Sequence, residues 1–185
     1  MIIASEGEKK DFTPISAGTI QGVCYDIWDI GLQKGEWKGE KIIQHKVIIG
    51  FEVTETIQEG EFKGKRMVTN KFYTLSLGEK ANLRKDLESW RGKAFTEKEL
   101  GGFDIENLIG VNAMLSIVHT EKGKAKISGI SKLMVGLPNM APENARSVPK
   151  WVEDFQAKAV EYPDDGSEST NNGTIDAGED SSIPF

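Results

Sequence analysis

The sequence predicts a small, mainly β domain with one principal helix, followed by a tail that does not fold. Five stretches are rich in β-branched and aromatic residues, which favour strands. One stretch, between the third and fourth of them, has apolar residues at helical spacing. The last stretch is acidic and polar, without Lys or Arg. We therefore expect a flexible leader (1–18), a folded domain (19–136), a coil with a short helix (137–162) and a disordered tail (163–185).

Three strands are expected in the first half of the domain, at Thr19–Asp29, Ile42–Thr54 and Arg66–Leu77. Between the first two, the glycine-rich stretch Gly31–Lys41 is typical of a loop. The third strand is predicted to be followed by a change from the strand period to the helical one.

The helix is expected at Glu79–Arg91, where Leu83, Leu87 and Trp90 form one apolar face. Ser76 and Glu79 fit a capping box, and Gly92 fits the helix end. The later elements are expected as a helical turn at Thr96–Glu99, a short helix at Phe103–Leu108, strands at Val111–Thr120 and Ala125–Met134, and a short helix at Trp151–Val160.

The predicted order is three strands, a helix and two strands. This is the order of the OB-fold, a five-stranded Greek-key barrel that binds oligonucleotides across its second and third strands and nearby loops. A closed barrel also removes the exposed edges that five short strands would leave. The sequence therefore predicts an OB-fold for residues 19–136.

Charge is unevenly distributed along the chain. The net charge is −6, and the tail alone carries six acids, so residues 1–162 are neutral. Residues 19–136 hold 16 acids and 18 bases. A nucleic-acid site would therefore be a local patch, and the balance fits a single-strand binder better than a duplex binder.

Cysteine usage and hydropathy give the expected location. Cys24 is the only cysteine, so neither a disulfide nor a cysteine-based metal site is expected. The sequence has no signal peptide pattern and no apolar run of membrane-spanning length. We expect a protein of the cytoplasm, with no membrane association and no cofactor.

The C-terminal residues carry a resemblance to a known family. The tail ends in three apolar residues after an acidic run, Glu179 to Phe185. This end resembles the acidic tip of bacterial single-stranded DNA-binding proteins, although Ser181 and Ser182 stand where acids are usual. The resemblance implies that replication and repair proteins bind the tip through Asp180, Ile183, Pro184 and Phe185.

A second resemblance covers about thirty residues of the domain. The run Leu75–Asp104 is similar to one seen in phage-encoded proteins of replication and single-strand binding. Together the two resemblances imply a phage single-stranded DNA-binding protein of replication, recombination or repair, located in the cytoplasm of a bacterial host cell.

A sequence-tolerant strand binder needs aromatic rings for the bases and cations for the phosphates. Alternation along the third strand places Tyr73 on the face of Lys71, so we expect Tyr73 to be exposed and Phe72 to lie in the core. The expected nucleic-acid-binding residues are Trp37, Lys38, Lys41, Lys46, Lys65, Arg66, Lys71, Tyr73, Lys122, Lys124 and Lys126.

Two other functions fit the sequence less well. One is a protein–protein adaptor that works only through its tip, and the other is a metal-dependent nuclease built from scattered acids. The sequence offers no nucleophile–base pair and no glycine-rich phosphate loop, so we expect no enzymatic activity. RNA would satisfy the same contacts as DNA, and the sequence leaves the oligomeric state open.

Overall fold

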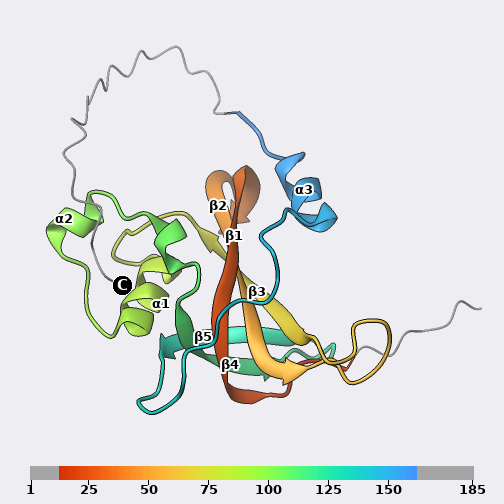
Figure 1. The fold of residues 1–185 in the computed structure, drawn as a ribbon. Coiled ribbons are helices and arrows are strands. Elements are labelled where there is room, and N and C mark those ends of the chain that lie inside the picture. Colours follow the sequence, from red (N-terminus) through yellow and green to blue (C-terminus); the bar gives the residue numbers. More distant parts are fainter. Residues whose placement is uncertain (1–12, 162–185) are drawn as a thin grey trace, which may run out of the picture.

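The computed structural model describes residues 13–161 and consists mainly of β-structure (Figure 1). Its elements are β1 (Gly18–Trp37), β2 (Glu40–Thr56), β3 (Arg66–Thr74), α1 (Asn82–Arg91), α2 (Glu97–Leu100), the 3-10 helix η1 (Ile105–Leu108), β4 (Asn112–His119), β5 (Ala125–Lys132) and α3 (Lys150–Gln156). The predicted mainly β class and the placement of a helix between the third and fourth strands are confirmed.

All five strands belong to one antiparallel sheet with the order β3-β2-β1-β4-β5. β1 is long enough to pair with β4 through its first residues and with β2 along most of its length. Register shifts between Cys24 and Asp26, and again between Asp29 and Leu32, bend it between these partners. The outer strands β3 and β5 also contact each other, so the sheet curls strongly.

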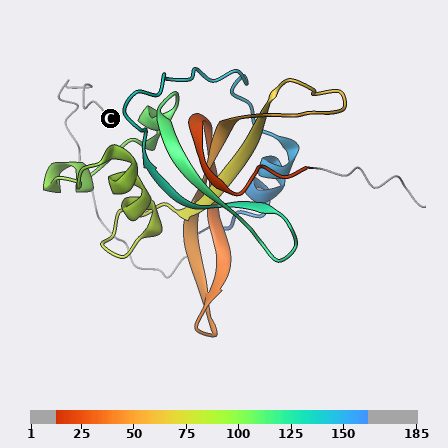
Figure 2. The ribbon, with the colours of Figure 1, turned by 90° about the horizontal axis from the view of Figure 1, so that it is seen from below.

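The inner face of the sheet encloses the main core. Alternate β2 residues Val47, Ile49, Phe51 and Val53 are buried there. The apolar face of α1 packs against them through Leu83, Leu87 and Trp90, as the helical spacing predicts. In this way α1 covers one side of the strands, and α3 lies on the other side (Figures 1 and 2).

The helix ends agree with the sequence only in part. The capping box expected at Ser76 and Glu79 is wrong, because α1 begins at Asn82 after Ala81, which makes no side-chain cap. Ser76 instead accepts a hydrogen bond from the backbone of Gly78. The helical turn expected at Thr96–Glu99 is confirmed as α2, which Thr96 and Glu99 cap reciprocally. Gly92 ends α1, as expected.

The loop expected at Gly31–Lys41 is wrong. These residues continue β1 and begin β2, and together with the following residues they form a two-stranded hairpin, residues 31–45, that we call the arm (Figure 2). Lys38 and Gly39, between the paired Trp37 and Glu40, have φ values of 51° and 85°. Two consecutive positive φ angles are typical of the tight turn that matches the twist of a hairpin, and glycine adopts them without strain.

Two expected coil regions contribute to packing. In the leader, Ile15 is buried in the main core, while residues 1–12 lie outside the described part of the chain. Residues 138–160, which we call the strap, fold back across β1 and β2 instead of leading away from the domain (Figure 1). The expected tail, residues 163–185, lies outside the described residues.

Buried carboxylates hold the strap. Glu52 of β2 is fully buried and accepts hydrogen bonds from the backbone N–H groups of Glu143 and Asn144. Asp26 of β1 accepts one from the backbone of Ser147 and another from the Arg146 side chain. A buried carboxylate is stable only with such donors, so the two acids fix the strap at defined positions.

The strap ends in α3, which covers a second, smaller core. Val152 is fully buried against Trp28, Ile30 and Ile48 on the outer face of β1 and β2. Gly50 makes this packing possible, because a Cβ there would lie 2.8 Å from the Trp28 ring. The outer face of the sheet is therefore apolar near α3.

Candidate nucleic-acid interface

Three hollows follow one another along β3. The largest, about 930 Å³, lies between the arm, the C-terminal end of β3 and the loop before α1. We call it the arm groove. Its lining includes Trp37 and Ile43 of the arm, Lys46 of β2 and Phe72 of β3.

The other two hollows extend the arm groove along β3 toward its start. The middle hollow, about 390 Å³, lies between β3 and β5 and shares Phe72 with the arm groove. The third, about 450 Å³, is lined by Val68 and Asn70 of β3 and by the β4–β5 turn. We call the three together the β3 track.

Lysines dominate the charge of the β3 track. Seven of them line the hollows, against three acids, Glu36, Glu79 and Asp86. Within residues 13–161, only Lys71 of the seven forms an ion pair, and it does so with Asp86. The six others are Lys46, Lys80, Lys85, Lys122, Lys124 and Lys126. Cations that line neighbouring hollows and form no ion pair within residues 13–161 suit a polyanion.

The prediction that Tyr73 is exposed and Phe72 lies in the core is wrong, because the two faces of β3 have the opposite orientation. Tyr73 is only 3% exposed and its hydroxyl donates to Asp86 at 2.7 Å, whereas Phe72 is 44% exposed and lines two hollows. Burial, together with the neighbouring Asp86 carboxylate, raises the pKa of the Tyr73 hydroxyl well above its ordinary value. Phe72, not Tyr73, is thus the β3 ring available for stacking.

Two expected phosphate-binding residues are already engaged within the fold. Lys71 pairs with Asp86 at 2.6 Å. Arg66 pairs with Glu143 at 3.0 Å, lies 3.5 Å from Glu52 and donates to the carbonyl of Ala141. Because these contacts hold the strap and α1 in place, Lys71 and Arg66 have a structural role in the described fold.

The remaining expected residues divide between the arm, the track and one loop. Trp37, at the end of the arm, is 65% exposed, and the Lys38 ammonium lies 5.9 Å from its ring centroid. Lys41 is exposed on the same arm. Lys46, Lys122, Lys124 and Lys126 lie in the β3 track. Lys65 lies outside the three hollows, over the ring of Phe62.

Sequence reasoning missed Phe72, Lys80 and Lys85 as site residues. Phe72 and Tyr73 are consecutive aromatic residues of one strand, so their side chains point to opposite faces of the sheet. The sequence does not show which of the two faces is the core. Lys80 and Lys85 belong to the segment from the α1 loop into α1, where a surface lysine is ordinary. Only the packing of α1 beside β3 places them at the hollows.

The expected tip residues, Asp180, Ile183, Pro184 and Phe185, lie outside the described part of the chain.

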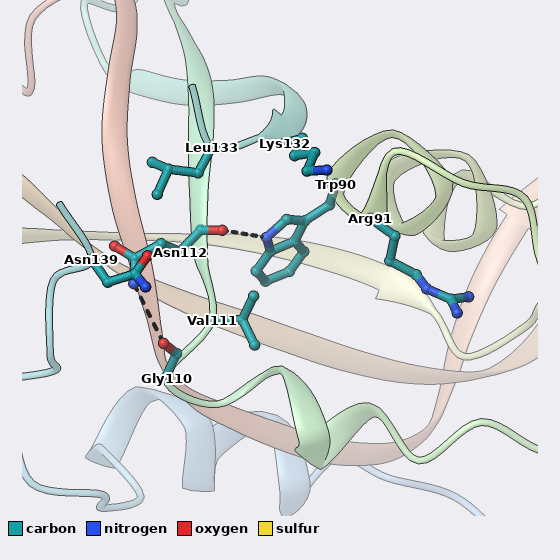
Figure 3. A pocket seen from close by; sticks show the side chains of 8 residues that line it. All are labelled: Trp90, Arg91, Gly110, Val111, Asn112, Lys132, Leu133 and Asn139. Atoms are coloured by element: carbon teal, nitrogen blue, oxygen red, sulfur yellow. Dashed lines mark hydrogen bonds between the residues drawn. The ribbon is translucent and has the colours of Figure 1, made fainter. Parts of the chain in front are cut away.

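A further hollow, about 360 Å³, lies at the C-terminal end of α1 (Figure 3). Its polar groups serve the fold. The indole N–H of Trp90 donates to the carbonyl of Asn112, the Asn112 side chain bonds Gln21 and Met140, and Arg91 is paired with Glu99. This hollow is therefore a weaker candidate for a ligand than the β3 track.

Within residues 13–161, no group of three or more His, Cys, Asp or Glu side chains is arranged to hold a metal ion.

Among the helices of residues 13–161, none has the length and apolar character needed to cross a membrane.

Comparison with known proteins adds no relative: no family model matches the chain, and no curated protein matches it.

Proposed function

We propose that the chain binds single-stranded DNA along the β3 track, without sequence preference and without catalysing a reaction. The observation that carries the proposal is the coincidence, beside β3, of three successive hollows, six lysines that form no ion pair within residues 13–161, and the exposed ring of Phe72. Cations suit the phosphates, and aromatic faces suit every base.

The topology supports the same function. We propose that the domain is an OB-fold, opened between β3 and β5 in the hydrogen-bonded order β3-β2-β1-β4-β5. In OB-folds, oligonucleotides lie across the second and third strands and the loops between the first and second and between the fourth and fifth strands. Here the corresponding parts are β3, the arm and the β4–β5 turn, which all line the β3 track.

The end of the tail completes the proposal. By its resemblance to the tips of bacterial single-stranded DNA-binding proteins, it would recruit replication and repair proteins through Asp180, Ile183, Pro184 and Phe185. The setting would then be phage DNA replication or recombination in a bacterial cell.

A direct titration tests strand binding. Fluorescence anisotropy of labelled oligo-dT with the full chain should rise to saturation at low salt, and the affinity should fall steadily as salt is added. An oligo-rU competitor separates RNA from DNA, and a duplex of equal length tests the preference for single strands. No anisotropy change at low salt would refute the proposal and favour an adaptor that acts through the tip alone.

A further inference from the structure

The four tryptophans of the chain fall into two classes. Trp28 and Trp90 are buried, and each indole N–H donates to a backbone carbonyl, that of Ser147 or Asn112 respectively. Trp37 and Trp151 are 65% and 39% exposed, and neither indole N–H has a hydrogen-bond acceptor among residues 13–161. Buried tryptophans normally bond their N–H, so the first class serves the fold and the second is available to a ligand.

Trp151 lies beside Phe72, one of the residues that line the arm groove. It contacts Phe72 with ring centroids 6.4 Å apart and an interplanar angle of 49°. In the β2–β3 register, Phe72 pairs with Ile48 under α3, and the next outward-facing pair, Thr74 with Lys46, lines the arm groove. The rings of Phe72 and Trp151 are therefore adjacent to the part of the arm groove that Lys46 lines.

The strap holds Trp151 firmly in this place. Val152, next to it, is fully buried, and Phe155 one turn later packs on the same side. The hydrogen bonds of Asp26 and Glu52 fix the chain before α3. A ring held this way loses little conformational freedom when a base stacks on it, which favours binding.

Packing occupies only part of the Trp151 ring. It contacts Trp28 and Phe155 edge-on, with ring centroids 5.7 Å and 6.5 Å apart, and 39% of the residue remains exposed. The exposed part of Trp151 adds to the exposed part of Phe72 to form one apolar patch beside cations, and such patches mark interaction sites.

We propose that Trp151 supplies a second stacking face beside Phe72, so that the C-terminal strap is part of the strand-binding surface. This inference rests on the proposed function. It assigns a binding role to a helix outside the five-stranded sheet, and it extends the β3 track from the arm groove onto α3.

The test compares the oligo-dT affinity of full-length variants at one fixed, low salt concentration. Trp151→Leu keeps an apolar side chain over Trp28 but removes the indole, and it should weaken binding about fivefold or more. Trp151→Phe, which keeps a ring, should recover most of the loss. Phe62→Leu removes an exposed ring outside the β3 track and is the matched control, expected to bind like the unchanged chain. Thermal unfolding shows that each variant is folded.

A fluorescence readout tests the same contact independently. In Trp37→Phe, the exposed indole that remains is Trp151, so oligo-dT should still quench emission, and adding Trp151→Phe should abolish that quenching. Affinity of Trp151→Leu within twofold of the unchanged chain, or quenching that is unaltered in the double variant, would overturn the inference while leaving strand binding intact. A failure of the unchanged chain to bind would instead refute the proposed function itself.

Discussion

At the scale of single residues, the neighbours Phe72 and Tyr73 have opposite roles. Tyr73 and Lys71 both bond one carboxylate oxygen of Asp86, which ties β3 to α1. Phe72 faces outward, into the track. In the proposed function, Phe72 therefore contributes to binding and Tyr73 to stability.

Phe72→Leu should therefore lower the affinity for oligo-dT about fivefold or more, because one stacking face is lost. Tyr73→Phe should leave the affinity unchanged and lower the free energy of unfolding by about 1 kcal/mol, since it removes one hydrogen bond. Anisotropy titration and urea unfolding measure the two effects. The reverse pattern, with affinity lost only in Tyr73→Phe, would contradict the assignment of faces.

Glu99 gives the fold a pH dependence. Hydrogen bonds, first from Arg91 and then from the backbone of Thr96, lower the pKa of the Glu99 carboxyl to about 2, below its ordinary value of 4.5. A carboxyl with a lowered pKa in the folded state binds its proton more readily when unfolded, so its stabilisation is present above about pH 4.5 and is lost as the pH falls toward 2.

Glu99→Gln should consequently flatten the loss of stability between pH 4.5 and 2 and lower the stability at pH 7, because Arg91 loses its charged partner. Thermal unfolding across this range measures both effects, with Glu97→Gln, an exposed neighbour, as the control. An unchanged acid slope in Glu99→Gln would show that other carboxyls dominate the acid range.

At the scale of elements, local sequence signals predicted most of the secondary structure. The helical spacing of Leu83, Leu87 and Trp90 was sufficient for α1, because one apolar face has to be buried. The arm could not be predicted in the same way. Its glycines are typical of a loop, and only its pairing across the Lys38–Gly39 turn makes it a hairpin.

The strap was unpredictable for a different reason. It has no periodic apolar pattern between residues 137 and 149, and its position depends on long-range bonds to Glu52 and Asp26. Those two acids look like surface residues in the sequence. The same limit applies to the site: Lys46, Lys122, Lys124 and Lys126 were identified as candidates from the sequence, but Lys80 and Lys85 were not, because only tertiary packing places them at the hollows.

Glu52→Ala should loosen the strap around residues 143 and 144, which Glu52 binds. The substitution leaves Arg66 and two backbone N–H groups without their carboxylate, and it should cost about 3 kcal/mol of unfolding free energy. Urea unfolding measures the loss, and limited proteolysis should cut first within residues 138–149. Glu59→Ala, at an exposed position, is the control. A loss no greater than that of the control would show that the carboxylate does not anchor the strap.

At the scale of the whole molecule, the negative net charge comes from the six acids of residues 163–185, whereas residues 1–162 are neutral. Although the net charge of the chain is −6, the β3 track is lined by more lysines than acids. Single strands release counterions with a slope of about −0.7 per phosphate contact in a plot of log affinity against log salt. If the six lysines of the track other than Lys71 all contact phosphates, the slope should be about −4.

Removing one of these lysines should make the slope shallower by about 0.7. Lys126→Gln, in the middle hollow, tests this, and Lys98→Gln, on α2 outside the track, is the matched control. The binding affinity of the Lys126 variant should fall for every oligonucleotide sequence alike. A slope that changes equally in both variants would indicate a general charge effect in place of a defined track.

The most direct test of the β3 track is a lysine footprint. The full chain is treated with an amine-reactive reagent with and without oligo-dT, and the modified positions are read by mass spectrometry. The account predicts that the strand protects Lys46, Lys80, Lys85, Lys122, Lys124 and Lys126 and leaves Lys98 and Lys132 as reactive as before. Protection of Lys98 and Lys132, with the six track lysines still reactive in the saturated complex, would contradict it.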